Sequence, residues 1–432
     1  MASTYLTAFE HQPLTVGSTD ICADLTTGEA EQLIFLGELR PGFCKRSYQA
    51  ISLAQYCGLV ALGNRSLEIL PKIDDDNRPD ECRGLLLRML REAADMSIFR
   101  HVAVGHNLRH APLLEVFISA FFDIVASLVR GGLLRQYQEH AEDLRVVRGH
   151  IITNRQFSVH ANRPDIVACR FDELTSDNLW NRLLKVALQT VGPWISNTEL
   201  YRRWIELKLA FDEVADIHAN VQMLNRLVFD RQATRYRLAI DWVRWILSLL
   251  SPDLRAGDNA APGLLFDMNV LFESVLAALI GRNAIGAGLT LFAQETEKYL
   301  VTVQESGGHR AFGLRPDLVI RRSEQVIAIG DTKWKRLVVR KDGYLLPPTQ
   351  DLYQMQAYAA AYSCENLALI YPWHSGLAGS KETAFELPRV GEMQPVVHIL
   401  CIDLHSDPFV LIRGLNMSEL VKLLPRGRAS KA

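Results

Sequence analysis

The sequence of 432 residues lacks the patterns that characterise several common protein classes. Its seven cysteines are scattered, odd in number and never spaced C-x-x-C, which argues against a disulfide framework or a structural zinc site. Charged residues interrupt every apolar run before it reaches the roughly 18 residues of a transmembrane helix. The first residues contain neither the basic segment nor the apolar core of a secretory signal. We therefore expect reduced thiols, a cytoplasmic location and no membrane contact.

A nucleotide-binding motif is also missing. No G-x-x-x-x-G-K-[ST] occurs, and GLAGSK at residues 376–381 lacks the required spacing. The formal net charge is −2, from 47 Lys and Arg against 49 Asp and Glu. This balance excludes a uniformly basic DNA-coating protein but allows a local basic channel. We expect that the chain does not hydrolyse nucleotides itself.

Three segments of different character follow one another along the chain. Residues 1–110 begin with short β-branched or alternating runs, which predict a β-rich domain. Residues 111–256 have apolar residues at three-to-four spacing and predict packed helices with Trp and Leu in their core. Residues 251–263 have the composition of a linker. Residues 257–432 alternate helix and strand patterns, which predict a central mixed sheet flanked by helices. The expected fold class is α+β, or mixed α/β.

Two short apolar runs within residues 314–336, LRPDLVIRRSEQVIAIGDTKWKR, each adjoin an aspartate. If these runs form a hairpin that turns through residues 323–325, Asp317 lies opposite Asp331 on one face, with Cβ atoms roughly 5 Å apart. Lys333 lies two residues beyond Asp331 and shares that face. Charged groups next to buried strands cost free energy unless something binds them. The spacing therefore predicts a polar site at the end of the hairpin.

Such a site suits a divalent cation. Two carboxylates held close together raise the pKa of one of them unless a cation neutralises the pair. Mg²⁺ prefers oxygen ligands, takes one or two carboxylates and keeps several waters. Lys333 beside a bound water can stabilise negative charge on a phosphate, which predicts metal-assisted phosphodiester hydrolysis. A hairpin that carries only a cross-strand salt bridge is the competing interpretation.

Two predicted helices supply further candidates. Glu273 lies among the apolar residues of LFESVLAALI and could be a third metal ligand; an ordinary surface charge is the other interpretation. Gln354 and Tyr358 are four residues apart, so they share one helix face. Gln354 could contact a DNA phosphate or the attacking water from that face.

The PD at residues 316–317, the DTK at 331–333 and the Q-x-x-x-Y at 354–358 together resemble the PD-(D/E)xK nuclease superfamily. Within it, the chain is similar to McrC, the nuclease subunit of the McrBC modified-cytosine restriction systems. The stretches that carry this resemblance are LEILPKI (67–73), VVRGHI (146–151), DELTSDNLWNRLLK (172–185), MNVLFESVL (268–276), LRPDLVI (314–320), GDTKWK (330–335) and YQMQAYA (353–359). They extend over most of the chain.

The resemblance implies a C-terminal PD-(D/E)xK nuclease domain that cuts DNA with Mg²⁺. Asp317 and Asp331 then correspond to the family's metal ligands and Lys333 to its catalytic lysine. The helix glutamate of the superfamily corresponds to Glu273. The resemblance also implies a hexameric AAA+ GTPase partner of the McrB type. The N-terminal β-rich part is expected to dock on this partner and to stimulate its hydrolysis of GTP.

Basic residues around the hairpin suit a DNA backbone, with modified double-stranded DNA as the expected substrate. Phosphate contacts from Lys and Arg give sequence-independent, salt-sensitive binding. The nine candidates are Arg310, Arg315, Arg321, Arg322, Lys333, Lys335, Arg336, Arg340 and Lys341. Exposed charges on a sheet edge are the alternative interpretation. Two other functions remain open: a PD-(D/E)xK repair or exonuclease-like enzyme that acts alone, and a non-catalytic adaptor that stimulates an AAA+ motor.

Overall fold

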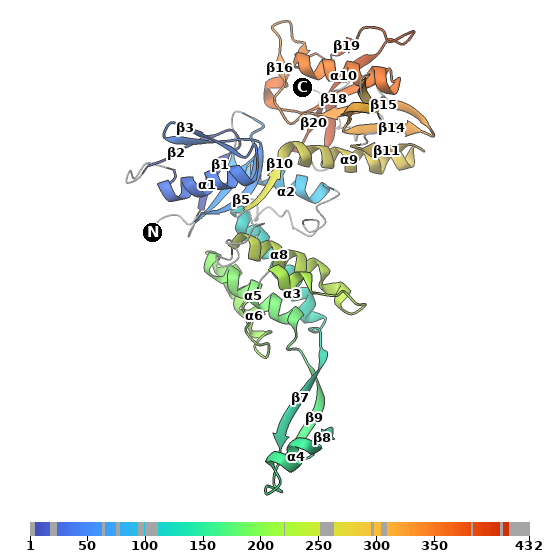
Figure 1. Ribbon diagram of the computed structural model, residues 1–432. Helices are drawn as coiled ribbons and strands as arrows, with labels where there is room; N and C mark the ends of the chain where they lie inside the picture. Colours follow the sequence, from blue (N-terminus) through green and yellow to red (C-terminus); the bar gives the residue numbers. More distant parts are fainter. Residues whose placement is uncertain are drawn as a thin grey trace. The chain divides into compact units, whose positions relative to one another are not determined.

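The computed structural model describes two compact units. Unit 1 contains residues 1–113 and 265–432, and unit 2 contains residues 114–264 (Figure 1). The expected first and third segments therefore share unit 1. Several sheets and helices give the chain the α+β class that the sequence predicts. The described residues are 5–17, 24–62, 65–74, 78–93, 99, 111–219, 221–250, 263–294, 298–303, 309–381, 383–406 and 409–413, so most of the expected linker at 251–263 lies outside them.

The N-terminal part of unit 1 contains two small sheets. One has the strand order β1-β6-β5-β10 and the other the order β2-β4-β3. Their strands are β1 (Tyr5–Phe9), β2 (Pro13–Thr15), β3 (Cys44–Ser47), β4 (Ala50–Leu53), β5 (Tyr56–Leu62), β6 (Arg65–Leu70) and β10 (Gly263–Asp267). The strand β10 comes from far along the chain, and Arg40 donates a hydrogen bond of 3.0 Å to the carbonyl of Leu265. The later part of the chain is thereby joined to the N-terminal sheet.

Two helices, α1 (Thr27–Leu39) and α2 (Pro79–Glu92), accompany these sheets. The first lies within the segment predicted to be β-rich, between its strands. The Thr26 hydroxyl accepts from the Glu29 backbone N–H while the Glu29 side chain accepts from that of Thr26, which forms a capping box. One face of α1 buries Ala30, Leu33 and Leu36. A short apolar run such as LIFL does not distinguish strand from helix, so the cap decides the structure here.

A mixed sheet forms the centre of the C-terminal part of unit 1. In the described part of the chain it has seven strands in the order β11-β14-β15-β18-β20-β19, with β21 also paired to β20. These strands are β11 (Thr290–Ala293), β14 (Leu318–Arg322), β15 (Gln325–Thr332), β18 (Asn366–Pro372), β19 (Ala384–Glu386), β20 (Val396–Asp403) and β21 (Val410–Arg413). The strand β15 pairs antiparallel with β14 and parallel with β18, so the sheet is mixed, as predicted.

Two further strand pairs lie outside this sheet. They are β12 (Lys298–Val303) with β13 (His309–Leu314), and β16 (Val338–Val339) with β17 (Leu345–Leu346). The predicted hairpin arm at residues 314–322 is consequently divided, because Leu314 ends β13 and the sheet strand β14 begins only at Leu318. The residues between them, including Pro316 and Asp317, form the bend where the site lies.

The helices α9 (Met268–Gly286) and α10 (Thr349–Tyr362) lie on opposite faces of the mixed sheet (Figure 1). Side chains of α10 such as Met355 and Ala359 pack in one core with Ile329, Leu369 and Ile399 of the sheet. Burial of this kind contributes about 25 cal/mol per Å² of apolar surface. Both helices thereby hold fixed positions against β15, the strand that ends at the predicted site.

One helix in the described part of the chain, α9, has a window at residues 268–285 that is long and apolar enough to cross a membrane. Half of that window is buried inside the structure. The helix contacts α2, β11 and β15. Its apolar character therefore matches its place in the core of unit 1.

Unit 2 contains helices that pack around buried tryptophans, as predicted. They are α3 (Leu113–Arg130), α5 (Leu179–Val191), α6 (Thr198–Leu209), α7 (Val221–Asn225) and α8 (Arg237–Leu250). Trp180 and Trp242 are almost fully buried. The Trp242 ring lies edge-on to Trp245, with ring centroids 5.2 Å apart.

A long β-hairpin in unit 2 corrects the prediction of an entirely helical segment. It consists of β7 (Gln136–Leu144) paired with β9 (Val167–Thr175), together with β8 (His150–Ile151) and the short helix α4 (Thr153–Val159) at its end (Figure 1). Both faces of β7 are largely exposed, so the strand has no alternating apolar pattern that sequence analysis could detect. Gly149 has φ 68° and a Cβ there would lie 2.3 Å from the Arg170 carbonyl oxygen, so only glycine fits.

Candidate functional site

The two aspartates lie at the open end of the hairpin formed by β14 and β15. Leu318 pairs with Gly330 in an antiparallel register. The same register continued by one residue sets Asp317 opposite Asp331. Strand pairing therefore places the two acids across from each other, at the edge between the sheet and the bend before β14.

The turn of this hairpin differs from the predicted one. Arg322 pairs with Gln325, so the turn has two residues, 323–324, instead of three. Ser323 has φ 55°, the positive angle that two-residue hairpin turns favour. A register shift just before Arg321 changes the pairing by one residue, as a β-bulge does. The bulge compensates for the shorter turn, and the two aspartates keep the predicted alignment.

Asp331 is the most buried acid of the site, with 1% of its surface exposed. Its Oδ1 accepts a hydrogen bond of 3.2 Å from Gln354 Nε2, and its Oδ2 forms an ion pair with Lys333 Nζ. Burial raises the pKa of Asp331 well above its usual range, and the negative charge of Asp317 adds to the rise, which Lys333 opposes. Burial is thus the main reason for the raised pKa, and two acids, Asp317 and Asp331, face one lysine, Lys333.

Asp317 is held against the last residues of β15. Its Oδ2 accepts from the backbone N–H of Thr332 at 2.6 Å and from the Thr332 hydroxyl at 2.7 Å. Its carbonyl accepts from the Gln294 N–H at 3.2 Å. The charge of Asp317 contributes to raising the pKa of both Asp331 and Glu273, so it acts electrostatically on strand and helix alike.

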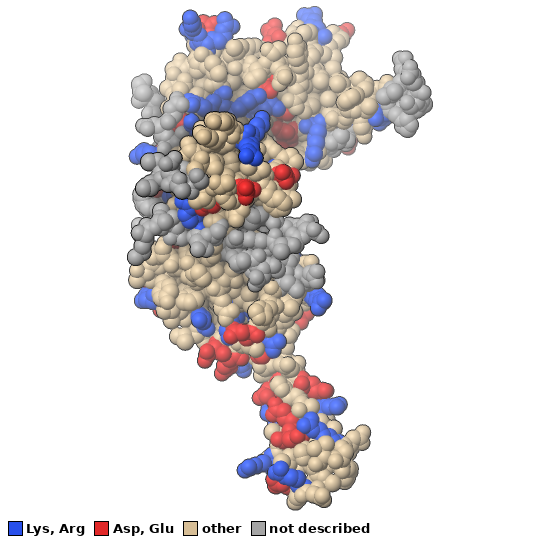
Figure 2. Space-filling view, turned by 60° about the vertical axis from the view of Figure 1, so that its left-hand side comes forward, with Lys and Arg blue, Asp and Glu red and all other residues tan. Residues whose placement is uncertain are grey.

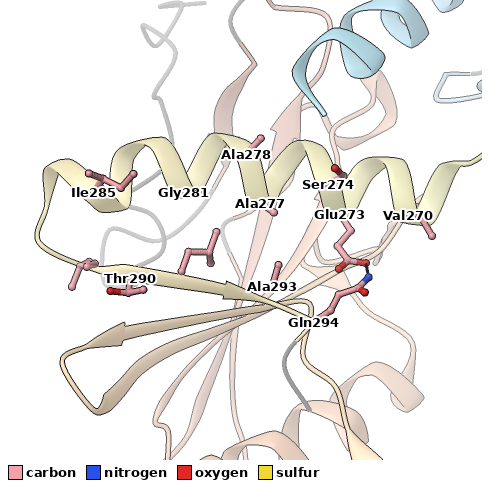
Figure 3. Close-up of a pocket in the computed structure, with 12 residues that line it drawn as sticks. Val270, Glu273, Ser274, Ala277, Ala278, Gly281, Ile285, Thr290, Ala293 and Gln294 are labelled. Atoms are coloured by element: carbon pink, nitrogen blue, oxygen red, sulfur yellow. Dashed lines mark hydrogen bonds between the residues drawn. The ribbon is translucent and has the colours of Figure 1, made fainter. Parts of the chain in front are cut away.

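Glu273 approaches this region from α9. It is 9% exposed, and its Oε2 accepts from Gln294 Nε2 at 2.8 Å (Figure 3). Burial is the main cause that raises the pKa of Glu273, with the charge of Asp317 as a further one. Glu273 lines a groove of about 720 Å³ between α9 and β11, whose other lining residues include Ala277 and Gly281. The groove gives this acid access to solvent.

Gln354 joins Lys333 to helix α10. Lys333 Nζ donates to Gln354 Oε1 at 3.0 Å, and Gln354 Nε2 donates to the Tyr358 hydroxyl at 2.7 Å. The Tyr358 hydroxyl donates to the carbonyl of Arg315 at 3.0 Å. Gln354 and Tyr358 share a helix face, as predicted. In this structure the Gln354 amide therefore holds the lysine and Asp331 in place; its predicted contact with DNA or water stays a prediction.

Sequence analysis missed three residues that contact the site. Thr332 and Gln294 hold Asp317, and Asp351 binds Lys335 with an Nζ–Oδ2 distance of 2.7 Å. Asp351 lies three residues before Gln354, so their shared helix face was a usable signal. Gln294 gave no signal, because it follows a strand whose position relative to α9 depends on the fold.

The donor atoms of the site suit Mg²⁺. Asp317 and Asp331 offer carboxylate oxygens at a position with excess negative charge, and Mg²⁺ needs only one or two carboxylates because it keeps several waters. Among the described residues, no three side chains of His, Cys, Asp or Glu come close enough together to hold a metal ion. The role of Glu273 as a third metal ligand therefore stays a prediction.

The surface around the site carries basic side chains. Lys and Arg gather on part of the unit 1 surface visible in Figure 2, and the hairpin of unit 2 carries both acidic and basic side chains. Several of the predicted DNA-binding cations have internal partners: Lys333 with Asp331 and Lys335 with Asp351. An ammonium group has three N–H donors, so each of these lysines can keep its carboxylate partner while it contacts a phosphate.

Comparison with known proteins identifies a family for most of the chain. The family model described as McrBC 5-methylcytosine restriction system component matches residues 51–372. That range includes Glu273, Asp317, Asp331, Lys333 and Gln354. The Escherichia coli (strain K12) protein "Type IV methyl-directed restriction enzyme EcoKMcrBC" is 25% identical over 331 residues, which are 70% of this chain and 91% of that protein.

Two solved structures from Thermococcus gammatolerans are also similar. A chain in the refined half-complex from the tetradecameric assembly of McrB AAA+ hexamers with bound McrC has a TM-score of 0.70 at 19% identity, covering 97% of this chain and 98% of that one. At this identity the likeness shows the fold. A chain in the cryo-EM structure of the McrBC complex has a TM-score of 0.51 at 25% identity, covering 65% of this chain and 88% of that one.

Proposed function

Because the chain belongs to the family of McrBC 5-methylcytosine restriction system components, we propose that it is the DNA endonuclease subunit of a modification-dependent, McrBC-type restriction complex. Its reaction is the Mg²⁺-dependent hydrolysis of phosphodiester bonds in modified double-stranded DNA. The strongest support for this proposed function is that Asp317, Asp331 and Lys333 lie together at the end of one β-hairpin. The mixed sheet between α9 and α10 is consistent with a PD-(D/E)xK nuclease domain over residues 257–432.

In the proposed site, Asp317 and Asp331 hold Mg²⁺, which when bound supplies a Lewis acid and lowers the pKa of a coordinated water. Lys333 stabilises negative charge on the phosphate that is attacked, since a fixed ammonium in a partly buried site acts strongly on nearby charge. Gln354 keeps Lys333 and Asp331 in register. Glu273 supports the pair through the Gln294 contact and is the candidate third acid.

The proposed partner is a hexameric AAA+ GTPase of the McrB type, whose GTP hydrolysis the chain stimulates. The Thermococcus gammatolerans structures contain McrB hexamers with bound McrC, which supports such an assembly for this chain. Residues 1–110 are the docking part that the sequence favours. The end of the unit 2 hairpin is a second candidate surface, because Phe157 and Val159 are 76% and 63% exposed. Exposed apolar side chains that lie close together are typical of protein interfaces. We place the complex in the cytoplasm.

The decisive experiment is Asp331→Asn, measured as cleavage of methylated plasmid with Mg²⁺ and the GTPase partner. We expect cleavage to fall by roughly 100-fold or more, as when about 3 kcal/mol of transition-state stabilisation is lost. The partner's GTP hydrolysis should stay at the wild-type level. The Asp212→Asn variant is the control, because it makes the same change at an exposed position of unit 2, away from the site.

The same assay separates the other functions. If Asp331→Asn cuts DNA as well as the wild type does, the assignment of the site is wrong. Cleavage by the chain without any partner would favour a nuclease that acts alone. GTPase stimulation without Mg²⁺-dependent cleavage by the wild type would favour a non-catalytic adaptor.

A further inference from the structure

Trp334, the residue after the proposed catalytic Lys333, forms hydrogen bonds with Glu10 near the start of the chain. The indole Nε1 of Trp334 donates to both carboxylate oxygens of Glu10, at 3.1 and 3.0 Å. Glu10 is 1% exposed and Trp334 is 8% exposed. Burying a carboxylate costs free energy, so we expect Glu10 to have a specific role at this position.

The N-terminal sheet fixes Glu10. The residue directly follows β1, and its backbone N–H donates to the Leu70 carbonyl at 2.9 Å. Its Oε1 also accepts from the backbone N–H of Lys72 at 2.7 Å. The next residue, His11, has φ 61°, an uncommon angle for a residue other than glycine, which turns the chain away after Glu10. The Glu10 backbone is therefore held by the last residue of β6, and its carboxylate by the backbone that follows β6.

Trp334 in turn fixes the peptide that carries Lys333. Its ring packs against Phe272, the neighbour of Glu273, with ring centroids 5.5 Å apart. The backbone N–H of Lys333 donates to the Ile370 carbonyl at 2.8 Å. The Lys333 side chain therefore leaves a backbone that is anchored on one side by β18 and on the other by the Trp334 ring.

We propose that Glu10 is a positioning residue for the nuclease site: through the indole of Trp334 it holds the backbone of Lys333 and so couples the N-terminal sheet to the proposed catalytic hairpin. This inference rests on the nuclease function proposed above. Small displacements of a catalytic group cost much activity, since a misplacement of about 1 Å can lower a rate 100-fold. Through this coupling, a partner that binds residues 1–110 contacts a part of the structure that is directly connected to Lys333.

Two conservative substitutions test the proposal. Trp334→Phe keeps a ring against Phe272 but removes the N–H donor. Glu10→Gln keeps the size of the side chain but replaces one acceptor oxygen with an amide that cannot accept. We expect each to lower kcat for DNA cleavage by roughly 10-fold and to leave KM for DNA within about twofold. The double variant should be no worse than Trp334→Phe, because Trp334→Phe removes the indole donor and Glu10→Gln takes away one of the two oxygens that accept from it.

Matched controls exclude a general loss of stability. Trp373→Phe removes an indole N–H that has no hydrogen-bond partner among the described residues, so it should cut DNA normally. Glu31→Gln makes the same charge change on the exposed surface of α1. Thermal unfolding of each variant is measured beside its kinetics.

The outcomes distinguish the two proposals. If the wild type cuts DNA and Asp331→Asn does not, but Trp334→Phe and Glu10→Gln cut at the wild-type rate, the positioning role is refuted while the nuclease function stands. Losses that add up in the double variant, or a change in KM alone, also refute it. If Glu10→Gln does not fold, Trp334→Phe against Trp373→Phe decides the question. A wild type that never cuts DNA refutes the nuclease function itself.

Discussion

Glu10 should make the stability of unit 1 depend on pH in a direction opposite to that of most carboxylates. Burial raises the pKa of Glu10 to about 7 from an ordinary value of 4.5, although hydrogen bonds from the Lys72 backbone and the Trp334 indole oppose the rise. The folded chain therefore keeps the Glu10 proton at pH values where the unfolded chain has lost it. The Glu10→Gln variant carries a neutral side chain of similar size at all pH values, so it removes this titration.

The sign and size follow from linkage. Stability decreases with increasing pH wherever the folded state binds more protons than the unfolded state. For Glu10 this window extends from about pH 4.5 to about pH 7. The rise in pKa is worth about 1.4 kcal/mol per pKa unit, so wild-type unit 1 loses roughly 3 kcal/mol across the window through this group. Below the window its contribution is fully present, and above it the loss is complete.

Urea unfolding of the wild type and Glu10→Gln at pH 5 and pH 8 measures the effect. We expect the free energy of unfolding of Glu10→Gln, relative to the wild type, to increase by roughly 2–3 kcal/mol between the two pH values. Glu31→Gln should show no such change. Equal differences at pH 5 and pH 8 for Glu10→Gln would refute the reasoning. If the positioning role is also correct, Glu10→Gln is more stable at pH 8 and yet cleaves DNA more slowly.

Two further predictions concern other parts of the chain. Arg83→Met should lower the free energy of unfolding by roughly 3–5 kcal/mol in a urea titration, because it removes the ion-pair partner of Glu68, which is 3% exposed. The control is Arg78→Met, at an exposed position. An equal effect of both substitutions would contradict the explanation. Phe157→Ser should weaken binding to the GTPase partner roughly 10-fold without changing the melting temperature, whereas Val228→Ser, at an 83% exposed position of the same unit, should bind normally.

Sequence analysis could predict the aspartate pair and its lysine, because local strand patterns and spacing determine their positions. The short apolar runs LVI (318–320) and VIAIG (326–330) predict strands, and the spacing of Asp317, Asp331 and Lys333 predicts a shared face. The alignment did not depend on the correct turn, since the bulge before Arg321 offsets the shorter turn at residues 323–324. Such compensation leaves no trace in the hydrophobic pattern. The strand order of the sheet was equally hidden, because β18 pairs with β15, and β20 with β18, across long separations in sequence.

The unit 2 hairpin shows a different reason for failure. Its strand β7 buries little on either face, so the burial that produces a period of two is missing there. Sequence analysis detects structure through the pattern of burial, and a segment that is exposed on both faces gives no such pattern. The helical prediction for residues 111–256 includes the exposed apolar residues near the end of the hairpin, such as Val146 and Phe157. Their exposure becomes informative only when the strands are known.

No local sequence pattern could predict the contact between Glu10 and Trp334. They are 324 positions apart, and each has an ordinary explanation in its own segment: a polar residue after a strand, and an aromatic residue in a core. The pairing of β10 with β5, the Arg40–Leu265 hydrogen bond and a hydrogen bond of 3.0 Å from the Met268 N–H to the Gln55 carbonyl help to join the N-terminal sheet to the start of α9. That α9 also carries Phe272, which holds the other side of the Trp334 ring. A site that is read in sequence as one hairpin is thus stabilised by three distant segments, and variants far from Lys333 should change cleavage when they disturb the packing that these segments share.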